Sequence, residues 1–150
     1  MAPLTEAAQP TAPQTTRRSR MVGPVLVAGI VGAATIALHV RDPHDSGSWG
    51  YCPWKLLTGL DCPGCGSLRA VNDLTRGDLV GAASSNLLFV ALIPVAVALW
   101  IAWARRSWTG EERRPRPSAS TTRAVWVAAI VVTVAFTVLR NTPWGSWLHS

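Results

Sequence analysis

Three long apolar runs constrain this chain more than any other feature of its sequence. Residues 21–40 contain one titratable side chain, His39, and residues 87–104 and 124–139 contain no charge. As helices rising about 1.5 Å per residue, the runs would reach roughly 30, 27 and 24 Å, close to the roughly 30 Å hydrocarbon core of a bilayer. The sequence therefore predicts an all-α integral membrane protein with three transmembrane helices.

Composition agrees with this fold class. Hydrophobic residues make up 49% of the chain and charged residues 15%, and the apolar ones are gathered into runs instead of being dispersed as in a soluble core. The first run follows an arginine cluster, as a secretory signal would. It is longer, however, than the roughly 7–15 apolar residues of a signal sequence. We interpret it as a retained membrane anchor.

The expected organisation alternates membrane helices with polar segments. In order, we predict a disordered cytoplasmic tail (1–20), a first transmembrane helix (21–40), an extracytoplasmic loop with all the cysteines (41–78), a helix containing the second transmembrane segment (79–104), a cytoplasmic linker (105–123), a third transmembrane helix (124–140) and an extracytoplasmic tail (141–150). The loop is expected to contain a short amphipathic helix over 67–76, with Ser67 as N-cap and Gly77 as C-cap glycine.

The basic residues predict the orientation of these segments. Nine of the fourteen lysines and arginines flank the N-terminal tail and the linker, which places both in the cytoplasm by the positive-inside rule. The cysteine loop and the C-terminus are then extracytoplasmic, in a multi-pass protein of the plasma membrane. The net charge of +6 reflects this topology, and we predict no nucleic-acid partner because no basic platform with interleaved aromatic residues is visible.

Three cysteines, Cys52, Cys62 and Cys65, lie within fourteen residues of the predicted loop. The last two form a C-x-x-C element across a Pro-Gly turn, ahead of the short helix. Three uses remain open. A disulfide between two of the three would brace the loop, which is common in an oxidising exterior. Thiol–disulfide exchange is the second use, although no thioredoxin-like strand pattern accompanies the motif.

A metal site is the third use of the cysteines. Three thiolates need a fourth ligand, and His44 is the nearest histidine in the sequence. Cys52, Cys62, Cys65 and His44 would together make a Cys3His set of the kind that binds zinc. Zinc is the one cofactor that this pattern suggests, but only one of the usual two close-spaced ligand pairs is present.

Arg69 is the other candidate residue. It follows the cysteines on a helix that otherwise offers apolar side chains to the bilayer, and an arginine there needs a partner. The candidates are Asp73, Asp61, a loop carbonyl and a lipid phosphate. We prefer a polar link that holds the loop onto the transmembrane helices over binding of an anion or substrate.

A spaced series of residues surrounds these candidates. It consists of Cys52-Pro53, Thr58-Gly59-Leu60, Cys62-Pro63-Gly64-Cys65-Gly66, Arg69-Ala70, Gly77-Asp78 and Asn86. In order and spacing it resembles the signature of the bacterial membrane family catalogued as domain of unknown function 2752. Leu87 departs from the family, which often has proline there. The resemblance covers residues 52 to about 100 and implies a small multi-span protein of bacterial membranes, without naming a substrate, cofactor or catalytic residue.

We therefore interpret the chain as a non-enzymatic structural or interaction component of a bacterial cell envelope, with a cysteine-braced extracytoplasmic loop. The alternative is a metal-binding or thiol-redox membrane protein that uses the CPGC motif. The expected partners are the lipid bilayer and either another membrane protein or a second copy of the chain.

Overall fold

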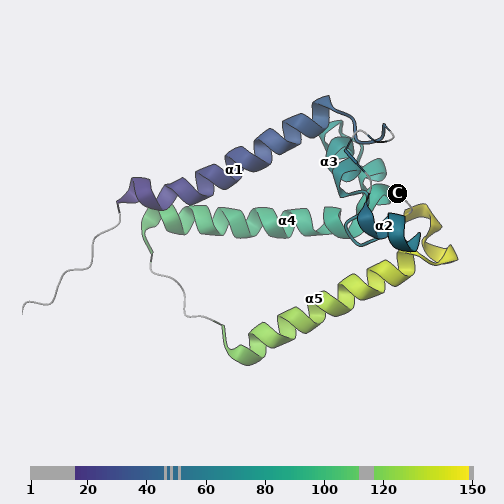
Figure 1. The fold of residues 1–150 in the computed structure, drawn as a ribbon. Helices are drawn as coiled ribbons and strands as arrows, with labels where there is room; N and C mark the ends of the chain where they lie inside the picture. The colour runs from purple at the N-terminus through teal and green to yellow at the C-terminus, as the bar shows by residue number, and fades with distance from the viewer. Residues whose placement is uncertain (1–15, 46, 48, 51, 112–116, 149–150) are drawn as a thin grey trace, which may run out of the picture.

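The computed structural model describes residues 16–45, 47, 49–50, 52–111 and 117–148 (Figure 1). The helices are, in order, α1 (Arg17–Val40), α2 (Pro53–Thr58), α3 (Ser67–Thr75), α4 (Leu79–Thr109), α5 (Ala119–Arg140) and the 3-10 helix η1 (Pro143–Leu148). The described residues contain no strand. Helices α1, α4 and α5 are each long and apolar enough to cross a membrane. The predicted all-α fold with three membrane helices and a short helix between the first two is confirmed.

The long helices end at capping residues and not where their apolar runs end. The side chain of Thr16 accepts a hydrogen bond from the Ser19 N–H and so caps α1 four residues before the expected start. Ser118 caps α5 in the same way, five residues early, and α4 continues past residue 104 to Gly110. Residues 1–15 of the expected tail and 112–116 of the expected linker lie outside the described residues.

At one end, here called the linker end, the start of α1 crosses the end of α4 (Figure 1). The indole N–H of Trp100 donates to the Pro24 carbonyl at 3.2 Å, and the Arg17 guanidinium lies 3.0 Å from the centre of the Trp108 ring. Gly23 permits this approach, because a Cβ there would lie 2.8 Å from the Trp103 ring. The contact therefore depends on aromatic side chains of α4 and a small residue of α1.

The opposite end, here called the cysteine end, holds α2, α3 and η1 (Figure 1). α3 lies between α1 and α4, and the side-chain amide of Asn72 donates to the Leu38 carbonyl of α1 at 2.7 Å. α3 begins after Gly66, whose φ of 78° is left-handed, so Gly66 and not Ser67 is the N-cap. Gly77, at a φ of 80°, closes the helix as expected.

Among the described residues, the bonds that join α5 to the rest of the molecule lie at the cysteine end. Within α5, Phe136 and Arg140 are buried, and the described residues before them are half-buried or exposed. In Figure 1, α5 approaches α4 near residue 140 and diverges from it toward the linker end. Most of the α5 surface is apolar and faces no other helix of the described chain, so lipid is its natural solvent.

Candidate metal centre

A tight turn brings Cys62 and Cys65 together. The Cys65 N–H donates to the Cys62 carbonyl at 3.1 Å, and Pro63 presets the backbone at the second position of the turn. The Cys62 N–H also donates to the Cys65 sulfur at 3.3 Å. The two sulfurs consequently lie 2.9 Å apart on one side of the turn.

Cys52 reaches the same place through α2, a helix that the sequence analysis did not predict. Pro53 occupies the first position of α2, and Gly59 ends it with a left-handed φ of 70°. This short helix reverses the chain, so that the Cys52 sulfur lies 3.5 Å from the Cys62 sulfur. Proline at the start and glycine after the end were the signals available in the sequence.

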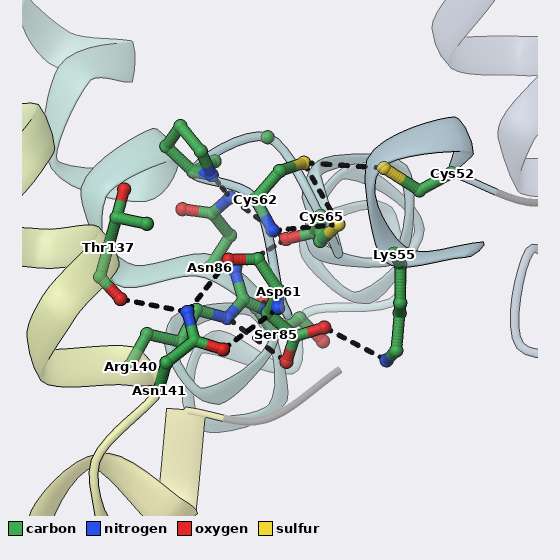
Figure 2. A network of polar contacts seen from close by, with 12 residues as sticks. Cys52, Lys55, Asp61, Cys62, Cys65, Ser85, Asn86, Thr137, Arg140 and Asn141 are labelled. Carbon is green, nitrogen blue, oxygen red and sulfur yellow. Dashed lines mark hydrogen bonds and ion pairs between the residues drawn. The ribbon is translucent and has the colours of Figure 1, made fainter. Parts of the chain in front are cut away.

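All three sulfurs lie within 4.8 Å of one another. Figure 2 shows the side chains of Cys52, Cys62 and Cys65 gathered at one place. A zinc ion with Zn–S bonds of about 2.3 Å holds tetrahedral sulfur ligands about 3.8 Å apart. The Cys62–Cys65 and Cys52–Cys62 sulfur separations, 2.9 and 3.5 Å, are both somewhat shorter than this value. Small side-chain rotations would therefore place all three sulfurs on one ion.

The three thiols differ in acidity. The backbone N–H of Lys55 is the main cause of a lowered pKa at Cys52, because it stabilises the thiolate. Burial raises the pKa of Cys65 to about 12, and its bond to Cys62 adds to the effect. Cys52 thus loses its proton more readily than Cys65, which keeps its proton at neutral pH unless a cation replaces it.

A buried ion pair lies behind the cysteine turn. Arg140, at the end of α5, is 0% exposed, and its guanidinium Nε lies 3.7 Å from a carboxylate oxygen of Asp61, which is 3% exposed. The other oxygen of Asp61 accepts from Lys55 at 2.9 Å. Arg140 also donates to the Cys65 carbonyl at 2.7 Å (Figure 2). The last membrane helix is thus bonded directly to the backbone of the CPGC turn.

Asn86 fastens the same turn to α4. Its side-chain amide donates to the Pro63 carbonyl at 2.8 Å and to the Cys65 carbonyl at 3.1 Å. Its backbone leaves the helical range, with φ −162° and ψ 91°, and its side-chain oxygen accepts the Phe89 N–H as a cap for the helix that follows. The Ser85 carbonyl accepts from Arg140 at 3.1 Å. The break in α4 therefore lets the side chains of Asn86 and Arg140 both bond carbonyls of the cysteine turn.

Asn141 completes the attachment from the other side. Its amide group donates to the Asp61 carbonyl at 2.9 Å, and its oxygen accepts the Asp61 N–H at 2.9 Å. Asp61 is therefore held by both its backbone and its carboxylate. The cysteine turn rests on a rigid polar support, which favours a preorganised arrangement of the sulfurs.

The structure does not bring His44 to the cysteines. The His44 ring nitrogens lie 2.8 Å from Asp42 and 3.3 Å from Asp73, and among the described residues the group that could hold a metal ion consists of the three cysteines. Bonds from the His44 backbone and ring lower the pKa of Asp42. The expected Cys3His set is therefore not assembled, since carboxylates of the loop and α3 hold the imidazole.

Arg69 is half-buried and donates from Nε to the Pro43 carbonyl at 3.5 Å. It does not pair with Asp73, which is held by His44 and by the Ser85 hydroxyl. Arg69 and the three cysteines border one open cavity of about 460 Å³. Of the partners considered from the sequence, a loop carbonyl is the one it contacts.

Sequence reasoning missed the residues of the polar support. Arg140 was predicted only as the last residue of the third transmembrane helix, and Asn86 was named only as a position of the resemblance. One signal was available: Asp61 and Arg140 were both predicted on the same side of the membrane, where an acid near three cysteines needs a cation. The local pattern around Arg140 carried no further sign of its burial.

Fold and site together fit a multi-pass helical membrane protein, with three helices long and apolar enough to span a bilayer and a thiol cluster at one end. Residues 52–100, which include all three cysteines and most of α4, match the model of the family described as "Protein of unknown function (DUF2752)". The resemblance inferred from the sequence is thereby confirmed over this segment. No curated protein and no solved structure gives a match.

Proposed function

We propose that this chain is a membrane protein that binds a thiophilic metal ion of the zinc type through Cys52, Cys62 and Cys65. The single observation that carries the proposal is the convergence of three sulfurs within 4.8 Å. A disulfide needs two sulfurs, whereas thiolates in threes are typical of zinc and other soft-metal sites.

The polar support favours the same function. Metal sites depend on groups behind the ligands that fix ligand orientation. Arg140 and Asn86 both hold the Cys65 carbonyl, at 2.7 and 3.1 Å. A fourth ligand would come from outside the three cysteines, through the cavity of about 460 Å³ that they border.

Zinc content of the purified protein tests this proposal. Reduced protein in mild detergent should bind one zinc per chain, and each single Cys→Ser variant should lose it. His44→Ala is the matched control and should keep zinc, because the His44 ring contacts Asp42 and Asp73. Stoichiometric zinc in a variant that lacks all three cysteines would exclude the site.

The affinity should also depend on pH. Zinc binds thiolates, so each thiol that binds must release its proton, and affinity rises as pH rises. Cys65, whose pKa is raised to about 12, holds its proton most strongly. Between pH 6 and 8 we expect zinc affinity to rise by up to roughly a thousandfold per pH unit if three protons leave. Competition with a chromogenic chelator measures the slope, and a flat profile would argue against thiolate ligands.

A structural role with a disulfide brace is the second candidate. The sulfur separations of 2.9 and 3.5 Å favour it, since small rotations would bring either pair to the roughly 2.05 Å of a disulfide. The lowered pKa of Cys52 also suits thiol–disulfide exchange. Counting free thiols without reductant separates the candidates: a brace leaves one free thiol, and a metal site leaves three once the metal is chelated.

We further propose a bacterial plasma membrane location with the cysteine end outside the cytoplasm. Arginines at the linker end support this orientation, since nine of the fourteen basic residues flank it. A reporter that works only outside the cytoplasm should be active when fused after Ser150 and inactive when inserted at Ser118. The reverse pattern would overturn the orientation.

A further inference from the structure

The cavity beside the cysteines contains an unsatisfied cation. Arg69 is half-buried, and its single hydrogen bond, to the Pro43 carbonyl, is 3.5 Å long, the upper limit for such a bond. A guanidinium has five N–H donors. No carboxylate of the described residues forms an ion pair with Arg69, so most of its bonding capacity is unused.

The other described arginines at the cysteine end each contact a carboxylate, an aromatic ring or a backbone carbonyl. Arg76 lies 3.0 Å from an Asp42 oxygen, Arg41 lies over the Trp49 ring, and Arg140 is bonded to two carbonyls beside Asp61. Among the described arginines of the cysteine end, Arg69 differs in that the long bond to Pro43 is its one side-chain bond, and it borders the cavity. An arginine in such a place is characteristic of a site for an anion.

The cavity wall indicates which kind of anion would fit. Its charged side chains are Arg69, Lys55 and Asp45, and Lys55 is already paired with Asp61. Trp49 and Leu68 add apolar surface. A volume of about 460 Å³ lies in the range of sites for small organic molecules and exceeds what a bare inorganic ion fills.

We infer that this cavity binds a small organic molecule that carries a phosphate group, which the Arg69 fork holds while Trp49 and Leu68 contact the apolar part. A guanidinium donates two parallel bonds to such a group. The start of α3 forms part of the same wall, so the positive end of its dipole adds to the attraction. The inference does not depend on metal binding by the cysteines.

Phenyl phosphate is a suitable probe, titrated calorimetrically into the reduced, metal-free full chain in nanodiscs of neutral lipid. We expect saturable binding of one molecule per chain, weakened at least tenfold by Arg69→Gln. Arg76→Gln is the matched control, because Arg76 is exposed and paired with Asp42, and it should change affinity less than twofold. Inorganic phosphate should bind more weakly than phenyl phosphate, since it lacks the apolar part.

Arg69→Lys keeps the test decisive if the glutamine variant does not fold. It retains the charge but loses the fork, so binding should weaken three- to tenfold. A second arm replaces part of the neutral lipid with phosphatidylglycerol: a rise in the apparent Kd of phenyl phosphate identifies a lipid headgroup as the phosphate source, and an unchanged Kd identifies a soluble molecule.

Two results would overturn the inference: no binding in either lipid, or equal affinity in the wild-type and Arg69 variants. Because the protein is metal-free throughout, neither result bears on zinc binding. Conversely, a chain that binds no zinc leaves this measurement unchanged.

Discussion

At the cysteine end, α5 is joined to the molecule by charged and amide side chains, whereas at the linker end α1 and α4 meet through tryptophans, a glycine and two arginines near the start of α1, Arg17 and Arg20. Arg140 and Asp61 are 0% and 3% exposed, and each is bonded to residues far away in sequence. The linker-end contacts are fewer, and one of them, between Arg17 and Trp108, is at an exposed helix start.

The difference between the two ends reflects their surroundings, which are protein around the buried polar groups and lipid around the apolar helices. Buried polar groups cost free energy unless bonded, so the cysteine end tolerates few substitutions. Apolar helices in lipid gain little by packing on one another, so the linker end and the length of α5 tolerate many. Four experiments, taken from the largest expected effect to the smallest, test this contrast.

Arg140→Leu should have the largest effect on stability. It leaves the Asp61 carboxylate without its guanidinium, removes the Arg140 donor from the Ser85 carbonyl, and leaves the Cys65 carbonyl with the Asn86 amide alone. Removing one partner of a buried ion pair costs about 3–5 kcal/mol. Unfolding in mixed detergent measures the loss. Arg123→Leu is the control at the opposite end of α5, where the side chain is exposed, and should cost less than about 0.5 kcal/mol. If the two substitutions lowered the free energy of unfolding equally, the expected difference between the two ends would be wrong.

Asn86→Leu and Asn72→Leu form a matched pair, since both asparagines are 0% exposed. Asn86 holds the cysteine turn, whereas Asn72 joins α3 to α1. Loss of a residue that orients ligands typically weakens metal affinity about 10–100-fold. We expect that loss for Asn86→Leu and less than threefold for Asn72→Leu, measured as zinc Kd. A similar loss in both would mean that general loosening, not ligand orientation, sets the affinity.

Trp100→Phe tests the linker end. It removes the indole donor to the Pro24 carbonyl but keeps an aromatic ring. Hydrogen bonds between membrane helices contribute about 0.6 kcal/mol on average, so we expect a loss of about 1 kcal/mol or less in detergent unfolding, with zinc affinity unchanged. A loss as large as that of Arg140→Leu would show that this end is equally constrained.

Ile130→Leu should have the smallest effect. Ile130 lies on the exposed face of α5, far along the helix from Arg140, and the substitution conserves volume. The free energy of unfolding should change by less than about 0.5 kcal/mol. A larger loss, seen only at high protein concentration, would point to a second copy of the chain on this face.

The features that could be predicted from the sequence are those that a local pattern of residues determines. Apolar runs defined the three membrane helices, and a glycine defined the end of α3. The polar support could not be predicted in the same way. Arg123 and Arg140 both flank the same apolar run, yet one is exposed and the other fully buried. Only the three-dimensional approach of α5 to a turn 75 residues earlier distinguishes them.

The break at Asn86 was missed for a related reason. It follows a stretch of small residues that continues a helical pattern, so the sequence favoured an uninterrupted helix. The structure breaks the helix there because the Asn86 side chain bonds the cysteine turn and the Phe89 N–H at once. His44 shows the converse: proximity in sequence suggested a ligand, but two carboxylates compete for its ring.

The bond between Arg140 and the Cys65 carbonyl also sets an order of events on the ribosome. Cys65 is synthesised 75 residues before Arg140, so the cysteine turn leaves the translocon before its guanidinium exists. Until the last span is inserted, the Asp61 carboxylate lacks a cation that it has in the finished protein. A nascent chain that stops short of residue 140 therefore lacks the guanidinium that bonds the Cys65 and Ser85 carbonyls in the finished protein.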